Sequence, residues 1–137
     1  MRSVAPDFVA AFASGGPVGF SCDITAFSEK HTEYFRKMVA ERKRDAAFWR
    51  EAVGRILCDA PEVLVLQYSD AALKDVRVIV VTGRSRQNRT TVRPILDPAL
   101  EYEHKGKRRE GALWMEQGVA VGTSMANAAE LRFTAVK

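Results

Sequence analysis

The sequence predicts an α+β domain in which one long amphipathic helix packs on an antiparallel meander sheet of about five to six strands. Residues 28–57 repeat apolar side chains with helical spacing, whereas residues 62–136 change to short, strand-like runs. The connections between those runs are shorter than the roughly twelve residues that a helical crossover needs. We therefore expect neighbouring strands to pair as hairpins.

Length and composition favour a single globular domain over residues 1–137. The chain is 47% apolar and 28% charged, which argues against disorder and coiled coil. No apolar run approaches the roughly 18 residues of a membrane span, so we expect no membrane partner. The two cysteines, Cys22 and Cys58, are too few for a disulfide framework. They predict free thiols and a cytoplasmic location.

The N-terminal segment, residues 1–27, is weakly patterned. Residues 18–27 alternate loosely, so the segment could add an edge strand, complete the core as a helix, or serve as an interaction arm. The sequence does not choose among these three.

The long helix is predicted over residues 28–57. Ser28 is a suitable N-cap, because its hydroxyl can accept a hydrogen bond from an unpaired backbone amide. Five consecutive charges at residues 41–45 interrupt the apolar face, so a short break there is the competing interpretation. The apolar face consists of Phe35, Val39, Ala46, Trp49, Val53 and Ile56.

The sheet is predicted over residues 62–136. Residues 63–66 and 76–82 are apolar on both faces, which is typical of central, covered strands. Pro94 has no amide hydrogen to donate, so its strand should be an edge or end there. The other expected strands are residues 90–96, 100–104, 112–116, 119–123 and 129–136. A long helix followed by such a meander is similar in element order to cystatin-like and nuclear-transport-factor-like domains, which implies no particular activity.

Positive charge is concentrated in residues 83–110. This stretch carries eight cations and four acids, so its net charge of +4 equals that of the whole chain. In a meander, alternate turns lie at one end of the sheet, and the two basic turns are separated by two strands. We therefore expect seven cations to share one anion-binding surface: Arg84, Arg86, Arg89, Lys105, Lys107, Arg108 and Arg109.

The leading hypothesis is a non-enzymatic binding module whose basic hairpin edge contacts a nucleic-acid backbone or an acidic protein surface. An ordinary explanation stands beside it, because basic hairpin tips also keep sheet edges soluble. The first alternative is a structural or assembly subunit, from a phage or mobile element, that self-associates as a homo-oligomer through sheet edges. The sequence does not decide whether the chain is an enzyme, but it favours a non-enzymatic role.

A small Mg²⁺-dependent nuclease is the third hypothesis. Glu103, His104 and Lys105 form the E-x-K triplet found in metal-dependent nucleases of the PD-(D/E)xK type, and Asp75 could supply the upstream carboxylate. The triplet is short and common by chance, and we expect His104 to be an ordinary exposed histidine. We therefore assign no catalytic or metal-binding residue.

Residues 122–126 look like the nucleophile motif of subtilisin-like serine proteases, but the likeness covers five residues and lacks the proline that should follow. The sequence also lacks C-x-x-C, H-E-x-x-H and a glycine-rich phosphate loop. We therefore expect no cofactor.

Overall fold

The structure is a computed structural model, and it describes residues 28–60, 63–82, 89–122 and 128–136. These residues form one six-stranded antiparallel sheet, in the order β1-β2-β3-β8-β5-β6, and one two-stranded sheet of β4 and β7. The strands are β1 (Val53–Ala60), β2 (Val63–Ser69), β3 (Asp75–Thr82), β4 (Arg89–Val92), β5 (Glu101–His104), β6 (Lys107–Glu110), β7 (Val119–Gly122) and β8 (Ala128–Val136). The described helices are α2 (Glu29–Arg44), α3 (Ala46–Glu51) and α4 (Gly111–Gln117).

The prediction of one long helix on a sheet is wrong. The helix over residues 28–57 divides into α2 and α3, and the last part of the segment is strand β1. The short break within the charged run 41–45 is confirmed, because Asp45 separates the two helices. At Ala52 the backbone turns extended, with ψ 135°, and the residues that follow pair with β2. Backbone pairing with a neighbouring strand overrides the helical spacing of Val53 and Ile56.

The meander is also wrong beyond β3. Strands β1, β2 and β3 do pair consecutively, but β8 lies between β3 and β5, and β4 leaves the large sheet to pair with β7. Residues 112–116, predicted as a strand, lie in α4. Gly111 and Trp114 are its buried residues, and their spacing of three is helical. Pro94 follows the end of β4 at Val92, which confirms that its strand ends there.

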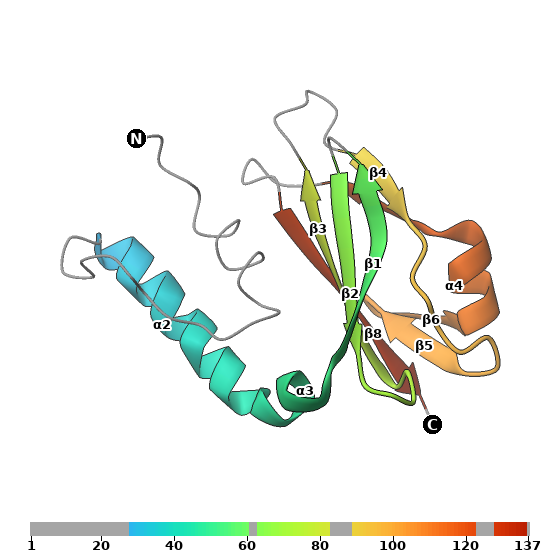
Figure 1. Ribbon diagram of the computed structural model, residues 1–137, viewed down its shortest axis with the longest axis horizontal. Coiled ribbons are helices and arrows are strands. Elements are labelled where there is room, and N and C mark those ends of the chain that lie inside the picture. The colour runs from blue at the N-terminus through green and yellow to red at the C-terminus, as the bar shows by residue number, and fades with distance from the viewer. Residues whose placement is uncertain (1–27, 61–62, 83–88, 123–127, 137) are drawn as a thin grey trace.

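The core lies on one face of the large sheet, between it and the layer of β4, β7 and α4 (Figure 1). Alternate residues of each strand point into this layer, which explains why one face of every central strand is apolar. The buried core residues are Val65, Val76, Val78, Val80, Val92, Leu96, Tyr102, Trp114, Val121, Leu131 and Phe133. The two runs predicted as central strands, 63–66 and 76–82, lie in β2 and β3.

Two buried polar side chains fasten the irregular segment after β4 to the sheet. Gln67 accepts a hydrogen bond from the amide of Ile95 and donates to its carbonyl, both at 2.8 Å. Tyr102 donates its hydroxyl hydrogen to the carbonyl of Leu73 at 2.5 Å and accepts from the amide of Asp97 at 3.1 Å. These contacts satisfy backbone groups that regular pairing leaves unmatched.

None of the described helices is long and apolar enough to cross a membrane.

Candidate functional site

The structure places part of the predicted basic surface and leaves the rest undecided. Arg84 and Arg86 lie outside the described residues, so the convergence of all seven cations on one surface stays a prediction. Strands β3 and β5 both run antiparallel to β8, so their C-terminal ends point in the same direction. Measured along the strand direction, the β5–β6 turn begins about 17 Å before the level at which β3 ends, for a rise of about 3.3 Å per residue.

Two of the seven cations already have partners within the chain. Arg108 pairs with Glu103, with Nε 3.1 Å from Oε2. Arg109 donates to Oε1 of Gln117 at 2.7 Å, and its guanidinium lies 5.1 Å from the centre of the Trp114 ring. The remaining described members, Arg89, Lys105 and Lys107, are exposed.

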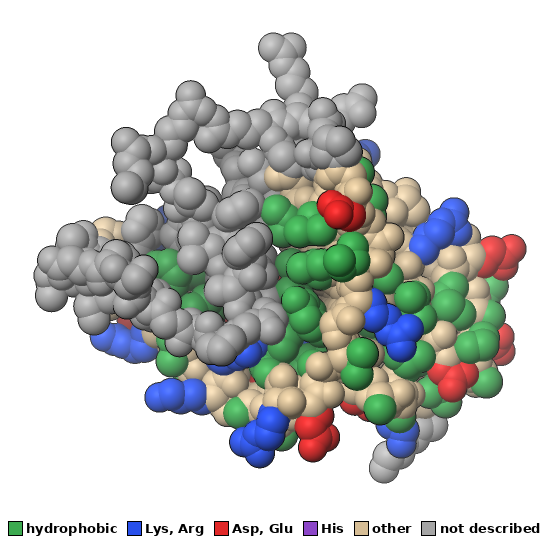
Figure 2. Space-filling view, viewed as in Figure 1, with side chains coloured by type: hydrophobic (Ala, Val, Ile, Leu, Met, Phe, Trp, Pro, Cys, Tyr) green, Lys and Arg blue, Asp and Glu red, His purple; other side chains and the backbone are tan. Residues whose placement is uncertain are grey.

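The charges are dispersed over the visible surface. On the face drawn in Figure 2, Lys and Arg side chains are scattered, several of them near Asp and Glu, and hydrophobic side chains gather in the middle. That distribution does not form a continuous positive field on this face.

The most organised polar feature lies on the sheet face opposite α4, which we call the ion-paired face. Register places Glu103 of β5 beside Thr134 of β8, and Thr134 beside Asp75 of β3. Arg108 of β6 is level with Glu103, so four neighbouring strands contribute to one row across the sheet. Cross-strand neighbours in an antiparallel pair lie close enough for their side chains to interact.

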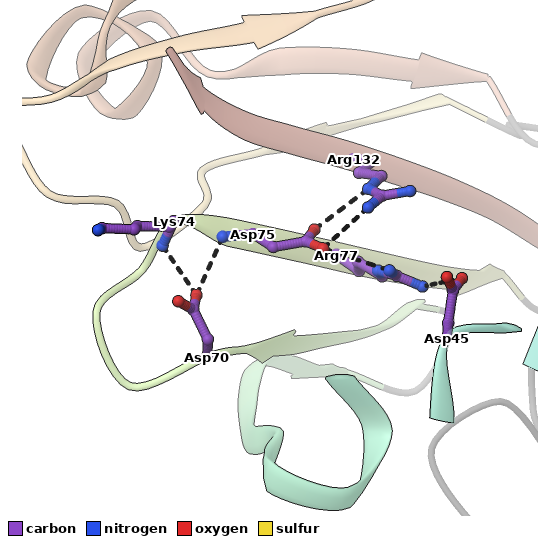
Figure 3. Close-up of polar contacts among 6 residues, drawn as sticks. All are labelled: Asp45, Asp70, Lys74, Asp75, Arg77 and Arg132. Atoms are coloured by element: carbon purple, nitrogen blue, oxygen red, sulfur yellow. Dashed lines mark hydrogen bonds and ion pairs between the residues drawn. The ribbon is translucent and has the colours of Figure 1, made fainter. Parts of the chain in front are cut away.

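Arg77 of β3 stands at the centre of the ion-paired face and is 4% exposed. Its Nη1 donates to Oδ2 of Asp45 at 3.0 Å, and its Nη2 donates to Oδ2 of Asp75 at 3.2 Å (Figure 3). Arg132 of β8 binds the same Asp75 carboxylate with two bonds, of 3.1 and 2.9 Å. Arg77 therefore joins the junction between α2 and α3 to the middle of the sheet.

Opposing effects set the pKa of Arg77. Desolvation by burial lowers it, but the hydrogen bonds and negative charges of Asp75 and Asp45 outweigh that effect and place the pKa above its ordinary value. The guanidinium also lies 4.0 Å from the ring centre of Phe48. Burial, followed by repulsion from Arg77, lowers the pKa of Arg42.

Asp70 fixes the turn that leads into this strand. Its Oδ1 accepts from the amides of Lys74 and Asp75, at 2.8 and 2.9 Å (Figure 3). Such side-chain-to-backbone bonds are typical of aspartate at a turn, and here they set the start of β3.

A shallow hollow of about 410 Å³ opens at the β5–β8 side of the ion-paired face. The described residues that line it are Glu103, Thr134, Ala135 and Val136. A carboxylate, a hydroxyl and backbone groups can together donate and accept hydrogen bonds at this hollow.

The nuclease hypothesis does not fit this geometry. Among the described residues, no group of three or more potential metal ligands lies together. Glu103 is paired with Arg108, and Asp75 with Arg77 and Arg132. His104, expected to be exposed, is 6% exposed and stacks on Phe133 with ring centres 4.5 Å apart. Side chains of β8 and α4 cover the face of β5 to which His104 points.

Sequence reasoning missed the residues that organise the ion-paired face, above all Arg77, Asp45 and Arg132. One signal was available, since Arg77 interrupts the apolar run of residues 76–81. A cation within a buried strand requires a partner, and the partner should be an acid from another element. Residues 123–127, which include most of the protease-like motif, lie outside the described residues.

Comparison with known proteins identifies the fold. The chain is similar to an α-galactosidase from Lactobacillus brevis, with a TM-score of 0.85 and 19% identity over 99% of this chain and 21% of that one. It is also similar to the GH36 α-galactosidase AgaA from Geobacillus stearothermophilus, with a TM-score of 0.84 and 20% identity over 98% of this chain and 20% of that one. The galactosidase domain of the α-galactosidase-sucrose kinase AgaSK matches with a TM-score of 0.80 and 20% identity, over 93% of this chain and 19% of that one.

The chain thus has the fold of a segment found in GH36 α-galactosidases, and it spans about one fifth of their length. No protein-family model matches the sequence, and no curated protein matches it. The hypotheses of a nucleic-acid-binding module, a phage or mobile-element assembly subunit and a nuclease are wrong, because the matching structures are carbohydrate-active enzymes. Local charge density had suggested a polyanionic partner, but one of its described members, Arg108, is paired with Glu103.

Proposed function

We propose that this chain is a non-catalytic β-sheet domain that supports an α-galactosidase-type catalytic domain. The observation that carries the proposal is the fold likeness, which extends over 98% of this chain but only 20% of the AgaA chain. A segment of that size in a larger hydrolase is a supporting part rather than the whole catalytic machinery.

The chemistry of the described residues agrees with a supporting role. Glycoside hydrolysis requires a pair of carboxyl groups, one of them able to donate a proton at the scissile bond. Three acids of the ion-paired face, Asp45, Asp75 and Glu103, are each held by an arginine. Each of these carboxylates already accepts a hydrogen bond from an arginine, so it is not free to meet a scissile bond.

A domain exchange tests this proposal. The matching fifth of AgaA would be replaced by this chain, and hydrolysis of raffinose, with which a variant of AgaA forms a complex, would be compared with that of AgaA lacking the segment. We expect the chimera to fold and to hydrolyse raffinose, and the deletion variant to be inactive. A chimera no more active than the deletion variant would contradict the proposal, as would raffinose hydrolysis by this chain alone.

Two further expectations belong with this proposal. We propose a cytoplasmic location, supported by the free thiol of Cys58, whereas Cys22 lies outside the described residues. We also propose that the chain can form homo-oligomers, which light scattering would test as a mass above the 15.2 kDa of one chain.

A further inference from the structure

We propose that the outer edge of β1 binds an extended strand of the α-galactosidase-type catalytic domain, which joins the large sheet beside β1. The proposal rests on the supporting role described above and names the surface through which the two domains meet. It is carried by the exposure of β1, by the contrast between β1 and β6, and by the side chains that β1 presents.

Strand β1 is open at its outer edge. Among the described strands it pairs only with β2, so its other backbone edge has no described partner. Six of its eight residues are exposed and none is buried, whereas six of the eight residues of β3 are buried. An unpaired edge presents backbone N–H and C=O groups that can form hydrogen bonds with an added strand.

The two edge strands of the six-stranded sheet differ in length and chemistry. Strand β6 has four residues, all of them charged, and short, charged edges discourage pairing with another chain. Strand β1 is twice as long and carries exposed apolar side chains, with Ile56 67% and Val53 43% exposed. A long apolar edge promotes aggregation unless a strand pairs with it, so β1 is suited to a permanent partner.

The register with β2 assigns the side chains of β1 to the two faces of the sheet. Arg55 is level with Gln67, which is buried toward the core, so Arg55 and Val53 lie on the core side. Gly54 and Ile56 therefore lie on the ion-paired face. Beyond Ile56 the register shifts by one residue, so the regular part of this edge ends there.

These side chains define the strand that fits. A Cβ at Gly54 would lie 3.1 Å from Cε1 of Tyr68, so the Tyr68 ring covers Gly54 and adjoins Ile56 on the same face. An apolar residue of the partner strand would pack on that surface. On the core side, Arg55 is exposed and favours an acidic neighbour across the new strand pair.

A second copy of this chain fits the edge less well. In the two-fold register that sets Ile56 of one copy on the Gly54–Tyr68 surface of the other, the axis passes through Arg55. The two arginines would then lie directly opposite each other, and like charges in that position are destabilising. A strand of different sequence avoids this repulsion.

Amide hydrogen exchange tests the inference by comparing the 137-residue chain alone with the AgaA chimera described above. In the chain alone, the amides of residues 53–56 that do not bond β2 should exchange rapidly. In the chimera they should exchange about tenfold more slowly or less, because the added strand bonds them. The amides of β6 should exchange alike in both.

Two substitutions locate the effect. Ile56→Lys in the chimera should abolish the slowing, whereas Leu113→Lys, at an apolar residue of α4 that is 40% exposed, should leave it intact. In the chain alone, neither should move the melting temperature by more than about 2 °C, which shows that both variants fold. If Ile56→Lys does not fold, Arg55→Glu tests the same edge by reversing its charge.

Several results would overturn the inference. One is equal exchange of residues 53–56 in the chain alone and in the chimera. Slow exchange in the dilute chain alone would mean that the chain covers its own edge, and slowing that appears only on concentration would assign the edge to a second copy. An active chimera with an unprotected β1 would refute this edge alone, whereas an inactive chimera would refute the supporting role and, with it, this partner.

Discussion

Replacing Arg77 with methionine should lower the free energy of unfolding by about 3 kcal/mol. The substitution keeps an unbranched side chain but removes the guanidinium, which lies over the Phe48 ring and makes two charged hydrogen bonds, of 3.0 and 3.2 Å, from a side chain that is 5% exposed. Removing one partner of a buried ion pair costs about 3–5 kcal/mol, because the other charge stays desolvated. Here Asp45 and Asp75 are 26% and 24% exposed, and Asp75 keeps Arg132, so the lower end applies.

Urea unfolding measures this loss, and a double-mutant cycle assigns it. Asp45→Asn combined with Arg77→Met should show a coupling energy of about 1–2 kcal/mol, because the two side chains are in direct contact. The matched control is Arg36→Met. Arg36 pairs with Glu33 at the same 3.0 Å, but both side chains are 71% exposed, so the change should stay within about 0.5 kcal/mol. Equal effects of Arg77→Met and Arg36→Met would refute the reasoning from burial.

Three other outcomes follow from the structure. Tyr102→Phe removes a hydroxyl that makes two backbone hydrogen bonds, and urea unfolding should show a loss of about 2 kcal/mol. Burial raises the pKa of Tyr102 above its ordinary 10.0, so the unfolded chain loses the phenolic proton at a lower pH than the folded chain. The free energy of unfolding should therefore fall as the pH rises above about 10. Urea midpoints measured across that pH range should fall less steeply for Tyr102→Phe. Gly118→Ala should lower the melting temperature more than Gly106→Ala. Both glycines have positive φ, at 67° and 77°, so both substitutions strain the backbone. A Cβ at Gly118 would also lie 2.7 Å from Cγ2 of Thr91, whereas a Cβ at Gly106 would have no atom within 4 Å. Equal shifts at the two glycines would contradict the steric argument.

Most strand positions could be predicted from sequence, because alternation and apolar runs depend on local burial. Residues 63–66, 76–82 and 129–136 were placed in strands and lie in β2, β3 and β8. Pairing order was not predictable in the same way. The insertion of β8 between β3 and β5 joins segments distant in sequence, and no turn signals it.

The two misassigned segments show where periodicity fails. Val53 and Ile56 continue the spacing of the helical face, but they are 43% and 67% exposed on β1. Trp114, in a run that alternates over five residues, belongs to the short helix α4 and is 4% exposed. Over so few residues the helical and strand periods both fit, and tertiary pairing decides between them.

The candidate site was missed because charge was counted along the chain rather than across the sheet. Residues 83–110 hold the whole net charge in sequence, yet in the fold Arg108 lies against Glu103 within that stretch. The one acid of β3, Asp75, meets an arginine from β3 and another from β8. A linear excess indicates an anionic partner only if folding leaves the cations unpaired. Strand pairing sets Arg108 beside Glu103 on the ion-paired face, so part of the linear excess is cancelled within the fold.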